Sequence, residues 1–181
     1  AGEITTRYDK MVPLPFGEYL PGPFILLRNW IRGPGNFRAG TEPKVFTVDY
    51  RTADGSLVPF TFTTPICYEA ILESAMRQLM DADVFVNITN DGWFGDTAAP
   101  HQHAMLAAAY ATEFGRPMLR IAYTGISMIV EPNGRIHDET EPYTNVSKIA
   151  SLSLTKFETP YRSWGRFFPM LASLIGLGAL G

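Results

Sequence analysis

The distribution of apolar residues predicts three strands in the first half of the chain. Residues 44–50 (KVFTVDY) and 57–67 (LVPFTFTTPIC) are rich in β-branched and aromatic residues, and a turn at 53–55 separates them. Residues 83–89 (DVFVNIT) form a nearly continuous Val/Phe/Ile run, which is typical of a buried strand. These segments alternate with helical patterns, so the chain is not an all-β protein.

Helical spacing appears in two long segments and one short one. Residues 69–80 carry apolar side chains at helical intervals, and the Ala-rich segment 101–115 predicts a helix that ends at Gly115, with a proline just beyond. Residues 24–32 form a short amphipathic piece inside a stretch rich in Pro and Gly. We expect one short helix there, within a long loop of the kind that usually has a function.

The second half of the chain predicts further strands. The segments are 117–123 and 126–132, a hairpin turn at 132–134 with a return at 135–139, and a last strand at 147–154. Strands and helices in this order predict an α/β layered fold with a mixed sheet.

The C-terminal residues 167–181 (FFPMLASLIGLGALG) contain no charge. A membrane-spanning helix needs about 20 such residues, so this run is interpreted either as the beginning of a span or as a C-terminal core helix. Arg162, Trp164 and Arg166 precede it, where interfacial anchors are expected.

Composition narrows the class of function. The 181 residues carry a net charge of −3, and this argues against a nucleic-acid binder, which usually has a basic face. One cysteine rules out an internal disulfide framework and a cysteine-rich zinc site, and three histidines make a multi-histidine metal centre improbable. We therefore expect no cofactor.

The single cysteine, Cys67, lies where a strand ends and a helix begins. A helix N-terminus offers free N–H groups and a positive dipole end, which favour a thiolate and an oxyanion. Many free cysteines are simply small buried core residues. The neighbours Tyr68 and Glu69 weaken that interpretation, because a carboxylate two residues after a cysteine is not typical of a core.

Two further groups of residues are candidates for the same site. Lys10 and Glu18 are interpreted either as a surface ion pair or as a lysine, fixed by a glutamate, that stabilises a tetrahedral intermediate. Trp93 and Phe94, flanked by glycines in the turn-rich loop 90–100, suggest either a shaped wall beside a site or a hydrophobic plug.

The two histidines at the start of the predicted helix 101–115 are a weaker signal. A nucleophile pair of Cys67 with His103, oriented by Asn90 or Asp91, is conceivable. Hydrogen bonding at the helix start is the favoured interpretation.

Several motifs together resemble the nitrilase superfamily and, within it, the apolipoprotein N-acyltransferase family. ICYE and PFGE by themselves indicate only a nitrilase-like protein, whereas NDGWFG followed by QH and then EFGRP is more specific to the acyltransferase branch. The matching segments, in the family's order, are RYDKMVPLPFGEYLP (7–21), ICYE (66–69), NITNDGWFGDTAAPHQH (87–103), ATEFGRPMLR (111–120), TGIS (124–127) and EPNGRI (131–136).

The resemblance implies a nitrilase-like αββα sandwich and a Glu–Lys–Cys triad. Cys67 matches the nucleophile, Lys10 the lysine and Glu18 a supporting glutamate, while Tyr68 and Glu69 match the two positions after the nucleophile. The general-base glutamate of the family has no counterpart here. We therefore interpret residues 1–160 as the C-terminal half of the catalytic domain and 164–181 as a truncated transmembrane helix, and expect the chain alone to be inactive.

The implied activity is transfer of a fatty acyl chain from a phospholipid, through a cysteine thioester, to the amine of diacylglyceryl-cysteine apolipoproteins. The implied location is the bacterial inner membrane, with the catalytic domain facing the periplasm. Apolar residues of the 20–40 loop are interpreted equally as lipid contacts or as a lid on the domain: Phe24, Ile25, Leu26, Leu27, Trp30 and Ile31. The alternatives are a soluble nitrilase-type amidase or carbamoylase and a non-catalytic interaction module.

Overall fold

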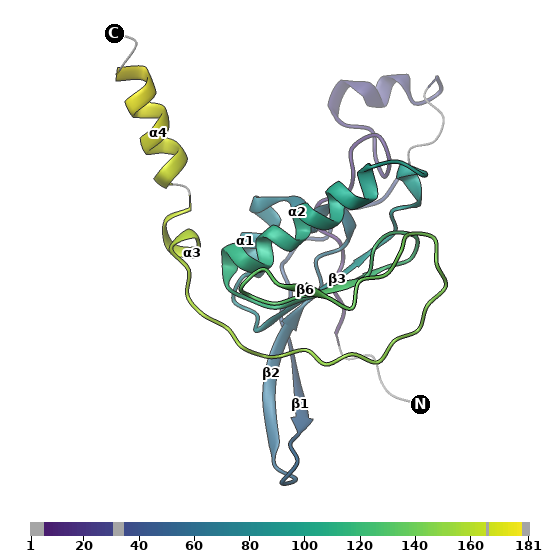
Figure 1. Cartoon of the computed structure of the whole chain (residues 1–181). Coiled ribbons are helices and arrows are strands. Elements are labelled where there is room, and N and C mark those ends of the chain that lie inside the picture. The colour runs from purple at the N-terminus through teal and green to yellow at the C-terminus, as the bar shows by residue number, and fades with distance from the viewer. Residues whose placement is uncertain (1–5, 31–34, 166, 179–181) are drawn as a thin grey trace.

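The computed structural model describes residues 6–30, 35–165 and 167–178 and places a six-stranded sheet at their centre (Figure 1). Strands follow one another in chain order, with β2, β3 and β4 parallel and the outer pairs antiparallel. The predicted mixed sheet is therefore confirmed. The strands are β1 (Phe46–Arg51), β2 (Leu57–Thr63), β3 (Val84–Thr89), β4 (Met118–Ala122), β5 (Met128–Val130) and β6 (Ile136–His137).

Helices cover one face of this sheet, and the longest, α2, lies across it (Figure 1). Gly115 ends α2 with a φ of 61°, the left-handed conformation that favours glycine at this position. The helical segments are η1 (Gly22–Leu27), η2 (Cys67–Ile71), α1 (Glu73–Leu79), η3 (Gly92–Phe94), α2 (Ala99–Phe114), α3 (Pro160–Trp164) and α4 (Phe167–Gly178).

The core lies between α2 and the sheet. Phe85 of β3 and Met118 of β4 are fully buried there against Phe114 and the small residues of α2. Side chains alternate along a strand, so Ile88 and Ile121, which pair across β3 and β4, point to the opposite face and stay exposed. One face of the sheet is thus packed, and the other carries exposed apolar side chains.

Three predicted elements differ from the structure. The helix expected over 69–80 is divided at Leu72, whose extended backbone separates η2 from α1. The short helix expected at 24–32 is the 3₁₀ segment η1, and residues 31–34 lie outside the described part. The strand predicted over 147–154 is wrong: this segment is irregular, because it pairs with no described strand and Ile149 is fully exposed.

The C-terminal apolar run is helical in its described part, α4, and the apolar side chains described on α4 are largely exposed. None of the helices in the described residues has the length and apolarity needed to cross a membrane. Residues 166 and 179–181 of the predicted span lie outside the described part.

Candidate active site

Cys67 begins η2, four residues after β2 ends, and is partly buried. Its φ of 50° is a left-handed conformation that non-glycine residues rarely adopt and that concentrates at functional sites. Two contacts fix the turn: Asn87 donates a hydrogen bond to the Pro65 carbonyl at 2.8 Å, and Ile66 forms a bridge with Ile88. The packed sheet therefore holds the cysteine in a strained position.

Glu69 connects this turn to a distant loop. The carboxylate is fully buried, and its Oε2 accepts a hydrogen bond from the Ile66 amide at 2.7 Å. Its Oε1 accepts from the amides of Met11 (2.6 Å) and Val12 (3.0 Å) and from the Tyr8 hydroxyl (3.0 Å). One side chain thus ties residues 8–12 to the neighbour of Cys67, although about 58 residues of chain separate the two.

Lys10 lies within the segment that Glu69 holds, and it pairs with Glu18. The Nζ–Oε2 distance is 2.6 Å, and the side chains are only 13% and 21% exposed. The same Glu18 oxygen accepts a hydrogen bond from the Leu14 amide at 2.7 Å. The pair is therefore largely shielded from water, and the prediction of a surface ion pair does not fit it.

Residues 35–40 pack against residues 8–18, the segment that carries Lys10 and is called the lysine loop below. The Phe37 amide donates to the Glu18 carbonyl at 3.0 Å, and the Gly40 amide donates to the Lys10 carbonyl at 2.7 Å. Gly40 passes so close that an added Cβ would overlap the carbonyl oxygen of Asp9. The lysine is thus supported by backbone on both sides.

A second buried polar group, centred on Asp91, lies at the end of β3. Its Oδ2 accepts from Arg120 Nη2 at 2.8 Å. Its Oδ1 lies 2.8 Å from Nδ1 of His103 and accepts from the Thr89 hydroxyl at 3.0 Å. Arg120 also donates to Asn87 Oδ1 at 2.6 Å. Arg120 and Asp91 are completely buried, so the pair needs these bonds to offset its desolvation.

The surroundings of Asp91 favour its ionised form. Burial by itself would raise the pKa of Asp91, but the hydrogen bond with His103 and the charge of Arg120 hold it below its usual value. Burial lowers the pKa of Arg120, and the Asp91 charge opposes that change.

Cys67 and His103 line one small cavity of about 30 Å³. Phe94 packs edge-on against the His103 ring, with centroids 5.7 Å apart, and Trp93 next to it is largely exposed. The lining residues are Leu14, Cys67, Tyr68, Ile71, Asn90, Trp93, Phe94 and His103. Trp93 and Phe94 thus line the same cavity as Cys67, and their role beside a site stays a prediction.

Sequence reasoning missed three members of this arrangement: Tyr8, Asn87 and Arg120. An arginine in the middle of the apolar strand MLRIA was the available signal, because a charge in a buried strand needs a partner. The structure brings together Cys67, Glu69 and the Lys10–Glu18 loop. Their catalytic roles stay predictions.

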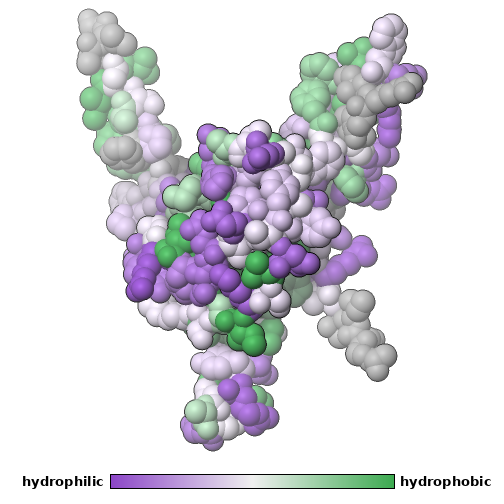
Figure 2. All heavy atoms as spheres, turned by 45° about the vertical axis from the view of Figure 1, so that its right-hand side comes forward, coloured by the Kyte–Doolittle hydropathy of each residue, from purple (hydrophilic) through white to green (hydrophobic). Residues whose placement is uncertain are grey.

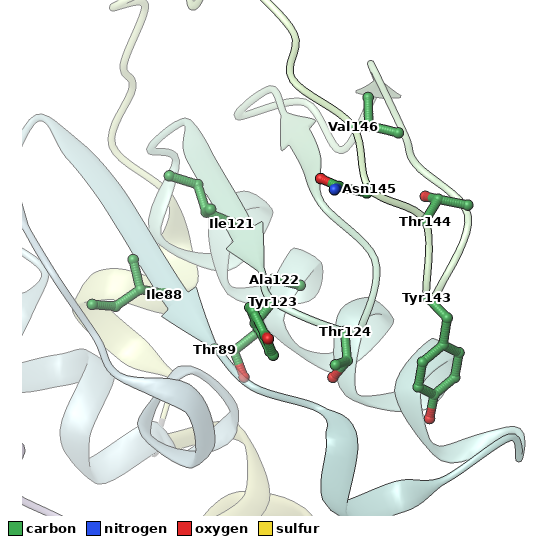
Figure 3. A pocket seen from close by; sticks show the side chains of 10 residues that line it. All are labelled: Ile88, Thr89, Ile121, Ala122, Tyr123, Thr124, Tyr143, Thr144, Asn145 and Val146. Atoms are coloured by element: carbon green, nitrogen blue, oxygen red, sulfur yellow. The ribbon is translucent and has the colours of Figure 1, made fainter.

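A larger hollow, of about 630 Å³, lies on the uncovered face of the sheet (Figure 3). Ile88 and Ile121 line it from the strands, and Tyr143 and Val146 line it from the loop opposite. It contains no cysteine, lysine, histidine or carboxylate. The candidate catalytic cysteine lines the smaller cavity and not this hollow.

The relatives of this chain agree with the fold and the motifs. It is 42% identical over 140 residues to the apolipoprotein N-acyltransferase of Agrobacterium fabrum, covering 75% of this chain and 25% of that protein. It is 33% identical over 188 residues to the enzyme of the same name from Rhizobium rhizogenes, covering 99% of this chain and 33% of that protein. The chain thus spans a third or less of the length of these two curated relatives.

Among solved structures, the amidase from Nesterenkonia sp. AN1 is 20% identical, with a TM-score of 0.42 over 70% of this chain and 47% of the amidase. The family model described as carbon-nitrogen hydrolase matches residues 1–155. This match covers the sheet, Cys67 and the lysine loop together, and on that basis the chain belongs to the carbon–nitrogen hydrolase family.

Proposed function

We propose that this chain supplies the C-terminal part of the catalytic domain of an apolipoprotein N-acyltransferase. Residues 1–160 would belong to that domain, and residues 164–181 would begin a membrane helix. The observation that carries the proposal is the Glu69 link between the lysine loop and the Cys67 turn. The names of the relatives support the choice of reaction.

In the first proposed step, the Cys67 thiolate attacks the ester carbonyl of a phospholipid. The C–S bond forms, the C–O bond breaks, and the lysophospholipid leaves with a proton from a general base outside this chain. Lys10, held by Glu18 at 2.6 Å, is a cation suited to stabilising the oxyanion. The strained backbone of Cys67 supports its assignment as the nucleophile.

In the second proposed step, the α-amine of a diacylglyceryl-cysteine apolipoprotein attacks the thioester. The C–N bond forms, the C–S bond breaks, and the electron pair returns to the Cys67 sulfur. The amine proton passes to the general base. A thioester suits this step because it remains reactive toward an amine.

Both proposed substrates are lipids in a bacterial inner membrane, and two exposed apolar segments support that location. The residues of η1 and α4 extend from the same side of the molecule, away from the tip of the β1–β2 hairpin (Figure 1). Figure 2 shows hydrophobic atoms on both projections. The exposed large apolar residues of η1, of α4 and of the turn after η1 are Phe24, Ile25, Leu26, Leu27, Trp30, Phe167, Met170, Leu171, Leu174, Ile175 and Leu177.

The uncovered sheet face supports the proposed αββα sandwich. Ile88 and Ile121 are exposed there, although apolar side chains in the middle of a sheet are normally covered. A second sheet packed on this face, contributed by chain outside these residues, would bury them.

The test is covalent labelling of the whole enzyme that contains these residues. Cys67 is the only cysteine of the chain, so a thioester within it can form only there. With phosphatidylethanolamine carrying a labelled acyl chain, we expect a hydroxylamine-labile band that is absent from Cys67→Ala and weaker in Lys10→Ala. Lys148→Ala, at an exposed lysine, is the matched control.

Labelling of Cys67→Ala at the unmodified level would refute the assignment of the nucleophile. Hydrolysis of small amides by the unmodified enzyme, with no labelled band from phospholipid, would favour the amidase alternative.

A further inference from the structure

His103 carries an unused polar atom at the centre of the site. Its side chain is only 3% exposed, and Nε2 has no hydrogen-bond partner, the single such buried side-chain atom in the part of the chain that the structure describes. A buried polar atom without a partner destabilises the folded state, because it has lost its hydrogen bonds to water. Such an atom needs an explanation, and a ligand is one.

The place of the His103 imidazole beside Cys67 limits the size of the group that Nε2 could bind. His103 and Cys67 line the same cavity of about 30 Å³, and Phe94 packs against the edge of the imidazole. Nδ1 of the same ring is bound to Asp91 at 2.8 Å, so Nε2 is the ring nitrogen left without a partner. The cavity has room for one group the size of a water molecule, so an acyl chain does not fit but a single nitrogen or oxygen does.

The partners of Nδ1 decide what Nε2 can bind. Nδ1 lies 2.8 Å from the ionised carboxylate of Asp91 and 3.2 Å from Nη2 of Arg120, which can only donate. The shorter contact is the one with the acceptor, so we assign the proton to Nδ1, which donates it to Asp91. In the neutral imidazole Nε2 is then an acceptor, with its lone pair unused. An oxyanion would be repelled by that lone pair, whereas a group with an N–H or O–H is attracted.

We propose that His103 Nε2 accepts a hydrogen bond from the attacking amine of the acyl acceptor and so positions it against the Cys67 thioester. This inference rests on the proposed function and adds a residue to its second step only. Asp91 and Arg120 act through His103: the carboxylate sets the tautomer and holds the ring, and Arg120 holds the carboxylate at 2.8 Å.

Water has the same donor chemistry as an amine, so the experiment must distinguish the two. In the whole enzyme, the thioester is first formed from phosphatidylethanolamine vesicles with a labelled acyl chain. A synthetic diacylglyceryl-cysteine peptide is then added, and its acylation and the slow hydrolysis of the thioester are followed separately.

Two variants of His103 and one control variant separate an effect on the placement of the amine from an effect on the stability of the fold. His103→Leu removes the acceptor, His103→Gln retains an acceptor oxygen on a side chain of similar length, and His101→Gln changes an exposed histidine in the same helix. Thermal unfolding of each variant is recorded in parallel.

We expect thioester formation within about twofold of the unmodified enzyme in all variants. Transfer to the peptide should fall about tenfold in His103→Leu, the factor expected for losing one hydrogen bond, and less in His103→Gln. His101→Gln should match the unmodified enzyme in both steps.

Three results would overturn the inference. Transfer at the unmodified rate in His103→Leu would show that Nε2 does not hold the amine. An equal fall in both steps would reduce His103 to a structural residue, and loss of hydrolysis alone would assign the cavity to water. If the unmodified enzyme never forms the thioester, the proposed function itself fails, and this inference fails with it.

Discussion

Two buried carboxylates lie near Cys67, and their partners differ in kind. Glu69 and Asp91 are both fully buried. Glu69 accepts four hydrogen bonds from neutral donors, three of them backbone amides. Asp91 is bound by the guanidinium of Arg120 and by His103.

Because their donors differ, the two carboxylates have different structural roles. An acceptor that binds backbone amides restrains the backbone itself and so fixes the conformation of a loop. Glu69 binds the amides of Met11 and Val12 and therefore determines where the lysine loop lies. Arg120 instead compensates the charge of Asp91, and that leaves Asp91 able to orient a side chain, His103. The two carboxylates should therefore respond differently to substitution.

The largest effect is expected at Asp91. Asp91→Asn leaves the buried Arg120 without a counter-charge, and breaking a buried ion pair in this way costs about 3–5 kcal/mol. Urea unfolding of the chain measures this loss. The double variant Asp91→Asn, Arg120→Met should recover part of it, because no charge is then left buried. Asp96→Asn, at an exposed position, is the control, and a loss as small as in that control would contradict the ion-pair argument.

Glu69→Gln should have the next largest effect. An amide cannot accept at both ends, so its NH₂ group must face a backbone donor, and the loss in unfolding free energy is about 1–3 kcal/mol. Hydrogen exchange at the Met11 and Val12 amides should accelerate more than exchange in α2. Exposed Glu139→Gln should change neither quantity. Unchanged exchange at these amides would show that Glu69 does not order the loop.

Acid should lower the free energy of unfolding by protonating Asp91. The folded-state pKa of Asp91 lies below its ordinary value of about 3.9. Its contribution to stability is therefore complete above that value and is lost as pH falls through the lower folded pKa. Between pH 4 and pH 2 the unfolding free energy should fall more steeply for the unmodified chain than for the double variant. Equal slopes would mean that Asp91 does not carry this acid sensitivity.

Tyr8→Phe should have the smallest effect. It removes one of four donors to Glu69 and leaves the backbone donors in place, so the expected loss is about 1 kcal/mol. Burial and the neighbouring Glu69 raise the pKa of Tyr8, so the hydroxyl stays protonated and donating. Exposed Tyr143→Phe is the control for loss of a hydroxyl. A loss as large as that of Glu69→Gln would show that the hydroxyl, not the backbone amides, dominates this contact.

Local patterns predicted most of the regular elements correctly. The apolar run of β3 and the Ala-rich run of α2 bury apolar side chains in one core, so pattern and packing agree there, whereas β1 and β2 form as predicted but stay largely exposed. The segment 147–154 has strand-like composition but is irregular, because a strand also needs a neighbour with free backbone groups. No local pattern contains that information.

The sequence by itself determined the candidates for chemistry: one cysteine, a lysine and glutamate eight residues apart, and an aromatic turn with a histidine after it. It also left open whether Lys10 and Glu18 form an ordinary surface pair and whether His103 only caps a helix. The tertiary structure shows that the Lys10–Glu18 pair is largely shielded from water and that His103 binds Asp91, because burial and hydrogen-bond partners come from segments far apart in the chain. Glu69 accepts from residues about 58 positions away, and Asp91 from Arg120, 29 positions away. Such contacts form only when the sheet brings the segments together.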